Sequence, residues 1–183
     1  MIPGSLARRY ARALLGLANS APQRDKFAKD MDAIADLAGQ KDVQGTPLIT
    51  ILGTERFPLA QRSKVLDSLA RRVGADPMVV KFLQYVLKRG RIDGTIAIAR
   101  SFRTMVDDVA GRMNAEITSA APLAPDAVAK IKAALSQATG KQIVATTAVD
   151  PDLIGGVVTK VGSFVIDGSV RASLSQLRTS LRG

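Results

Sequence analysis

The hydrophobic periodicity of this 183-residue chain changes once, near Gly111, and that change constrains the fold more than any other feature. Before it, apolar residues recur every three or four positions, which is the spacing of an amphipathic helix. After it, Met113, Ala115 and Ile117 alternate with polar residues, as in a half-buried strand. The sequence therefore predicts an α+β chain with two domains, residues 1–109 and 110–183.

The first part is predicted to form a six-helix bundle. Glycines suit left-handed helix ends, and prolines suit first helical positions because their φ is already helical. Ser5 is expected to cap the first helix and Gly39 to end the second, and a weak third helix covers 42–53, interrupted by Gly45 and Pro47. The fourth is expected to run from Pro58 to Gly74, the fifth from Asp76-Pro77 to Gly90, and the sixth to carry Ile92 to Val109.

The second part is predicted to be a small β-α-β-β-α module. Its expected elements are a strand over 113–118, a helix after Pro125 closed by Gly140, a strand over 143–149, strands over 157–161 and 164–166, and a helix carrying Val170, Leu174, Leu177 and Leu181. Ser169 is placed to accept hydrogen bonds from the first free N–H groups of that last helix.

The turns of the second part rest on a compact backbone signature. Asp150-Pro151 starts a turn because proline fixes φ and pushes the preceding residue to an extended conformation. Gly155-Gly156 then allows a bulge or a close backbone approach before the strand over 157–161. Asp167-Gly168 is expected to end the short strand over 164–166. The signature supplies backbone geometry and no reactive group.

Composition argues against catalysis. The chain has no cysteine and no histidine, which removes thiolate chemistry, the commonest general base and the commonest metal ligand. Gly155-Gly156 with Lys160 lacks the spacing of a phosphate-binding loop. The pairs Asp150/Asp152 and Asp107/Asp108 suit turns and helix ends better than acid–base work. We expect no enzyme, no cofactor and no metal site.

Residues 77–89 form the most informative predicted helix. Its polar residues Lys81, Gln84 and Lys88 occupy a stripe of about 60° at 100° per residue. Apolar residues cover most of the remainder, more than one buried face requires. Two interpretations stay open: a central helix buried by its own bundle, or a helix with one side in the core and another in a groove for a partner's amphipathic helix.

The net charge of +10 indicates an acidic partner surface, a nucleic acid or anionic lipid, or simply a solvated basic face. The basic residues are densest between Arg56 and Arg103. The absence of tryptophan and the few other aromatic residues disfavour base stacking. No stretch approaches the roughly 18–20 apolar residues of a membrane span. The Arg-rich start mimics a targeting segment, but we expect it to be mature structure.

Three segments resemble one family. The string from Asp150 to Leu181, the opening Ala7-Arg8-Arg9-Tyr10-Ala11-Arg12-Ala13-Leu14, and the segment from Lys81-Phe82-Leu83 to Arg89-Gly90-Arg91-Ile92 are similar to the delta subunit of F-type ATP synthase, called the oligomycin-sensitivity-conferring protein in mitochondria. The three segments lie in order at the start, middle and end, so the resemblance spans essentially the whole chain.

The resemblance implies a non-catalytic stator connector. Residues 1–109 would bind the N-terminal helix of an alpha subunit, and residues 110–183 would bind the b subunits of the peripheral stalk. One copy would sit in a hetero-oligomer at the cytoplasmic face of the cell membrane, attached only through the complex and binding no nucleic acid. The implied groove would draw on Tyr10, Leu14, Val79, Phe82, Leu83 and Val86, with rim charges from Arg8, Arg12 and Lys81.

The alternatives from other classes are a basic nucleic-acid-binding module and a membrane-surface protein that uses helix 5–19. DNA binding that survives moderate salt would indicate the first alternative. Liposome binding by the isolated chain would indicate the second.

Overall fold

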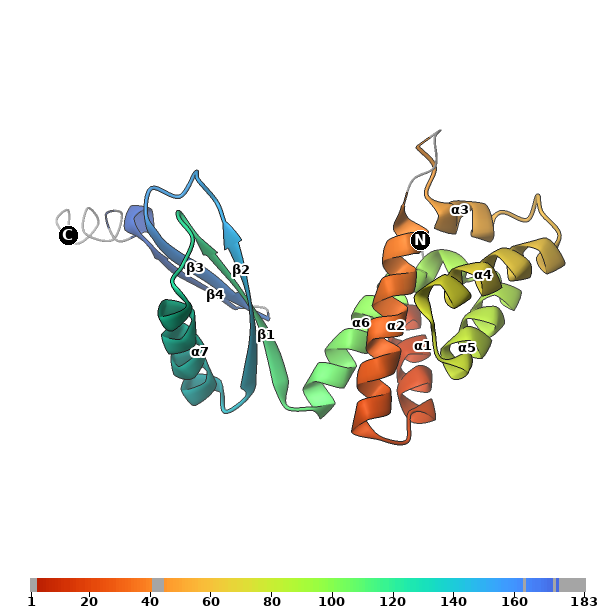
Figure 1. Ribbon diagram of the computed structural model, residues 1–183, viewed down its shortest axis with the longest axis horizontal. Coiled ribbons are helices and arrows are strands. Elements are labelled where there is room, and N and C mark those ends of the chain that lie inside the picture. Colours follow the sequence, from red (N-terminus) through yellow and green to blue (C-terminus); the bar gives the residue numbers. More distant parts are fainter. Residues whose placement is uncertain (1–2, 41–44, 163, 173, 175–183) are drawn as a thin grey trace. The chain divides into compact units, whose positions relative to one another are not determined.

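The structure is a computed structural model that describes residues 3–40, 45–162, 164–172 and 174 (Figure 1). The chain divides into two compact units, residues 1–106 and 107–183. The division lies inside a helix, shortly before the predicted boundary at 109–110. Among the described residues, no helix is both long enough and apolar enough to cross a membrane.

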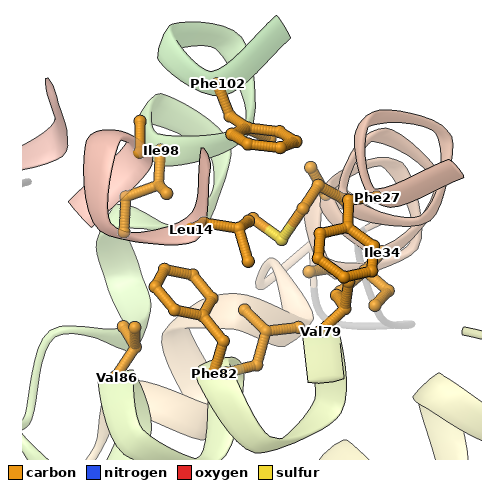
Figure 2. Close-up of a cluster of buried hydrophobic side chains, with 14 of the residues drawn as sticks. Leu14, Phe27, Ile34, Val79, Phe82, Val86, Ile98 and Phe102 are labelled. Atoms are coloured by element: carbon orange, nitrogen blue, oxygen red, sulfur yellow. The ribbon is translucent and has the colours of Figure 1, made fainter. Parts of the chain in front are cut away.

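The first unit is helical. Its elements are α1 (Gly4–Leu17), α2 (Ala21–Gly39), α3 (Leu48–Gly53), α4 (Leu59–Val73), α5 (Pro77–Lys88), the 3₁₀ turn η1 (Ile92–Gly94) and α6 (Thr95–Val109). The core side chains come from several of these helices, and Figure 2 shows Leu14 of α1 between Phe102 of α6 and the α5 residues Val79 and Phe82. Helices far apart in sequence therefore share one core.

Several helix boundaries follow the predicted chemistry. Gly74 ends α4 with a left-handed φ of 67°. Asp76 caps α5, where its carboxylate accepts from the Met78 N–H at 2.9 Å, and Pro77 takes the first helical position. Gly74, Asp76 and Pro77 therefore define the turn between α4 and α5, and all three can be recognised in the sequence.

Other predicted boundaries are wrong. Ser5 lies inside α1, since Pro3 precedes the helix, and Pro58 precedes α4 rather than starting it. Gly39 is the last helical residue of α2 instead of a left-handed cap, because the chain leaves the helix through an extended Gln40. The predicted helix from Ile92 begins as the 3₁₀ turn η1. Residues 41–44 of the weak predicted helix lie outside the described residues.

The second unit is a four-stranded sheet with a helix packed on it. Its elements are β1 (Arg112–Ser119), α7 (Pro125–Thr139), β2 (Gln142–Val149), β3 (Gly156–Val161) and β4 (Phe164–Ser169). The strand order is β2-β1-β3-β4, with β1 parallel to β2 and antiparallel to β3, and β3 antiparallel to β4. Leu135 of α7 packs against Ala115, Ile143 and Val161 to form a separate small core.

The edge strand β4 exposes apolar side chains on both faces of the sheet. The register pairs Val161 with Phe164, so Phe164 lies on the face that α7 partly covers, and Val165 lies on the opposite face. Phe164 is 73% exposed and Val165 is 61% exposed. This strand buries little of its apolar surface within its own unit.

The predicted close backbone approach at Gly156 is confirmed. Its φ is 85°, and a Cβ there would lie 2.3 Å from the carbonyl oxygen of Gly168 on β4. The predicted cap at Ser169 is confirmed as well, because its Oγ accepts from the Ala172 N–H at 3.1 Å. Leu177 and Leu181, predicted for the helix that follows, lie outside the described residues.

Candidate functional site

An open groove lies between α1 and α5, two helices that contact each other in the first unit. Its volume is about 500 Å³. It is lined by Arg9, Tyr10, Ala13 and Leu17 of α1 and by Met78, Lys81, Phe82 and Tyr85 of α5. Tyr10, Ala13 and Leu17 are three or four residues apart on α1, and Met78, Lys81 or Phe82, and Tyr85 are three or four apart on α5, so each helix presents one continuous stripe to the groove.

The floor of the groove is aromatic and aliphatic. The rings of Tyr10 and Phe82 meet edge to face, with centroids 6.4 Å apart and planes at 72°. Leu17 is 42% exposed, Met78 38% and Tyr85 49%. Large apolar side chains with this much exposure on facing helices form a surface suited to an apolar partner.

The rim of the groove is basic. Arg9 and Lys81 line it from opposite helices, and no acidic residue is among the side chains that line it. The Arg89 guanidinium lies 5.1 Å from the centroid of the Tyr85 ring, within cation–π distance. Positive charge therefore flanks the apolar floor on both sides.

The nine residues predicted for partner binding separate into three groups. Tyr10, Lys81 and Phe82 line the groove. Arg8 and Arg12 are exposed on α1 but are not among its lining residues. The remaining four, Leu14, Val79, Leu83 and Val86, are fully buried in the helical core.

The burial of Leu14, Val79, Leu83 and Val86 corrects the predicted groove. These four side chains lie where α1 and α5 pack on each other and on the rest of the bundle, so they present no surface to a partner. The groove is also lined by five residues that were not among the nine predicted, namely Arg9, Ala13, Leu17, Met78 and Tyr85. The second apolar stripe on α5, at Met78, Phe82 and Tyr85, was the signal that could have found part of this set.

A second hollow of about 600 Å³ lies between α4 and α5. Gln84 donates to Asp67 across these helices at 2.7 Å, and Ala70, Gly74 and Ala75 form much of the wall. With no aromatic side chain in its lining, this hollow offers no large apolar anchor. The α1–α5 groove is the better candidate for partner binding.

The carboxylate pairs that the sequence displays have structural partners. Asp107 accepts from Arg112 at 3.2 Å and from Asn114 at 2.7 Å. Asp150 accepts from the Asp152 N–H at 3.0 Å, which closes the predicted turn. Among the described residues there is no cluster of three His, Cys, Asp or Glu side chains that could hold a metal ion.

An apolar groove with a basic rim in one unit, and an apolar edge strand in the other, define a protein that binds other polypeptides. The sequence matches the family described as ATP synthase delta (OSCP) subunit over residues 6–181. The chain belongs to this family, which supplies a structural stator component of F-type ATP synthase and no catalytic subunit.

Individual relatives agree along the whole chain. The ATP synthase subunit delta of Myxococcus xanthus is 37% identical over 184 residues, covering 100% of this chain and 99% of that protein. The ATP synthase subunit delta of Anaeromyxobacter dehalogenans is 37% identical over 183 residues, with the same coverage.

The fold has a counterpart among solved structures. A chain of the Toxoplasma gondii mitochondrial ATP synthase hexamer superimposes with a TM-score of 0.68 at 20% identity. The match covers 97% of this chain and 98% of that chain, so the similarity of fold extends over both units.

Proposed function

We propose that this chain is the static connector between the catalytic head and the peripheral stalk of an F-type ATP synthase. The first unit binds the N-terminal helix of an alpha subunit in the α1–α5 groove. The second unit binds the end of the stalk formed by the b subunits. One copy serves each complex, at the cytoplasmic face of the membrane, and it meets the membrane only through the complex.

The α1–α5 groove is the observation that carries this proposal. An amphipathic helix binds by placing its apolar face into a hydrophobic groove through a few anchors along one stripe. Tyr10 and Tyr85, above the largely buried ring of Phe82, give the groove rigid aromatic surface of the kind that carries most binding energy in such interfaces. The groove is open in the free chain, so the partner helix needs no rearrangement of the bundle.

The basic rim specifies the charge of the partner. Arg9 and Lys81 stand on opposite sides of the groove, so a helix with acidic residues flanking its apolar stripe is complementary to it. Such exposed charges mainly accelerate encounter and fix orientation, whereas the buried apolar anchors supply affinity.

The second unit offers the surface for the stalk. Large exposed apolar residues lie on β4, in the loop before β3 and at the start of the helix after β4, namely Ile154, Phe164, Val165, Ile166 and Leu174. Exposed apolar clusters of this kind in a soluble unit mark protein–protein interfaces. Two separate binding surfaces, one in each unit, are what a connector requires.

The mechanism is mechanical. A rotating central shaft exerts torque on the catalytic head, and a head without a static tether would rotate with the shaft and waste the proton gradient. The tether performs no chemistry. It must remain bound at both ends under load, which favours apolar anchors with slow dissociation.

The two alternative functions have less support than the binding of a helix in the α1–α5 groove. A membrane-surface role for α1 requires a free apolar face, yet Ala7, Ala11 and Leu14 of that face are buried in the bundle. Nucleic-acid binding would use basic surface with exposed stacking residues, and the exposed Tyr85 already stacks with Arg89 above an apolar floor. The groove fits a helix better than either ligand.

The groove is tested with the full chain and a synthetic peptide of the N-terminal helix of the alpha subunit from the same organism. Met78→Asp and Tyr85→Asp should weaken binding about a hundredfold or more in calorimetry, because a carboxylate would lose water in an apolar contact. Both residues are exposed in the free chain, so circular dichroism should show an unchanged helical fold.

Val65→Asp is the matched control, since Val65 is 42% exposed on α4, outside the α1–α5 groove. It should bind the peptide like wild type. Leu83→Asp should instead unfold the bundle, because Leu83 is fully buried. Folded Met78→Asp and Tyr85→Asp variants that bind with wild-type affinity would show that the groove assignment is wrong.

A further inference from the structure

Asp30 on α2 is a buried carboxylate in an otherwise apolar bundle. It is 7% exposed, and among the described residues only Asp30 and Asp107 are charged and buried. Burying a charge is costly unless hydrogen bonds and an opposite charge replace the lost water. Because removing the carboxylate would leave its hydrogen-bond donors without an acceptor, the contacts of Asp30 define its role.

The contacts of Asp30 converge on the turn between α4 and α5. Its Oδ2 accepts from the backbone N–H of Asp76 at 2.8 Å and from Lys26 Nζ at 3.0 Å. The same Lys26 Nζ also reaches the carbonyl oxygen of Gly74 at 3.4 Å. The carboxylate and its lysine thus bind α2 to both ends of the three-residue linker, residues 74–76, that separates α4 from α5.

The fastened turn is the start of one groove wall. Asp76, whose N–H donates to Asp30, is itself the cap of α5 and accepts from the Met78 N–H at 2.9 Å. A continuous chain of hydrogen bonds therefore runs from α2 through Asp76 to the first turn of α5. Met78 is a lining residue of the α1–α5 groove, and Lys81 and Phe82 lie one turn further along the same helix.

We propose that Asp30 is a positioning residue for the partner groove: it holds the first turn of α5 at the distance from α1 that a bound helix requires. This inference rests on the proposed function of the groove. Asp30 does not line the groove and has no direct contact with its occupant. Its effect on binding is transmitted through Asp76 and the helix that Asp76 caps.

The test compares Asp30→Leu and Asp30→Asn in the full chain, using the alpha-subunit N-terminal peptide as the probe. Asp30→Leu should lower peptide affinity about tenfold, the scale of one lost hydrogen bond to a charged group. It should also speed hydrogen exchange at the Asp76 and Met78 amides. Asp30→Asn keeps an acceptor oxygen for the Asp76 N–H and should restore most of the affinity.

Asp32→Leu is the matched control. Asp32 lies on the same helix but pairs with Arg103 of α6, and neither residue lines the groove. This variant should lower stability toward denaturant while it leaves peptide affinity and exchange at Asp76 unchanged. If Asp30 had only a structural role, Asp30→Leu would likewise lower stability toward denaturant and leave peptide affinity and exchange at Asp76 unchanged.

The outcomes are distinguishable. No peptide binding by the wild type would refute the proposed function itself. Wild-type binding together with equal binding by Asp30→Leu would overturn the positioning role. If Asp30→Leu does not fold, Asp30→Glu decides, because it keeps the charge but moves the acceptor by one methylene: lower affinity supports positioning, and unchanged affinity overturns it.

Discussion

At the scale of single residues, Asp167 and Ser169 join β4 to the helix that follows. The backbone N–H of Ser169 donates to Asp167 Oδ1 at 2.9 Å, while the Ser169 Oγ accepts from the Ala172 N–H. Hydrogen bonds from the backbone and then the hydroxyl of Ser169 hold the pKa of Asp167 below its ordinary value of 3.8. The ionised carboxylate therefore favours the folded junction.

The lowered pKa of Asp167 determines how the stability of this junction depends on pH. Because the pKa of Asp167 is lowered on folding, its contribution to stability is present above pH 3.8 and is lost as the pH falls through the folded pKa. Ser169→Ala keeps the backbone N–H, which is the larger cause, and removes only the hydroxyl, so the pKa of Asp167 should rise part of the way toward 3.8, as measured by NMR titration of the carboxyl carbon. An unchanged pKa in that variant would show that the hydroxyl makes no contribution.

Residue type alone could not separate groove from core in this chain. Leu14 and Leu17 lie on the same helix and are equally apolar, yet Leu14 is fully buried and Leu17 is 42% exposed. On α5, Leu83 is fully buried and Tyr85 is 49% exposed. The apolar circumference of residues 77–89 left open whether the helix is buried by its own bundle or also faces a groove, and only the packing of α1 on α5 determines which residues are buried and which line the groove.

At the scale of elements, the β3–β4 hairpin depends on one glycine. A Cβ at Gly156 would lie 2.3 Å from the Gly168 carbonyl oxygen and 2.8 Å from the Ser169 Cα, and φ at this position is 85°. Backbone atoms of a paired strand cannot move aside without breaking the pairing. Both the steric contact and the backbone conformation exclude a side chain there.

Gly156→Ala should therefore destabilise the second unit by about 2 kcal/mol or more, measured by chemical denaturation. Gly162→Ala is the control, because Gly162 also has a positive φ of 58° but has open space around its Cβ direction. It should cost only the backbone strain, about 1 kcal/mol. Equal losses in the two variants would show that the close approach is not the cause.

Element boundaries were predictable where one residue determines them by local chemistry. Gly74 and the pair Asp76-Pro77 act through φ preference and a side-chain cap, and both boundaries appear as expected. Gly39 is instead the last helical residue of α2, and residues 92–94 form a 3₁₀ turn before α6, so glycine preference and periodicity did not determine these two boundaries. The switch from helices to a sheet near Gly111 follows the change of hydrophobic period.

At the scale of the whole molecule, the two units have separate cores. The core of the first unit extends from Ala7 to Val106, and that of the second centres on Ala115, Leu135, Ile143 and Val161. None of these residues is shared between the two clusters. The units are therefore expected to lose stability independently when either core is altered.

Leu135→Ala should destabilise the second unit by about 2–4 kcal/mol, since it removes the largest side chain that α7 buries on the sheet. The helical signal of the first unit and its affinity for the alpha-subunit peptide should not change. Denaturation followed by circular dichroism, with calorimetry of the peptide, measures both. A parallel loss of peptide affinity would indicate that the two cores are coupled.

The position of the first core, which ends at Val106, also affects how the chain folds while it is being synthesised. Every described buried residue of that core is synthesised before the sheet begins at Arg112. Translation at about 5–20 residues per second leaves several seconds for the synthesis of residues 112–183, and helical bundles fold in microseconds to milliseconds. The α1–α5 groove can therefore form on the ribosome before the second unit has been translated in full.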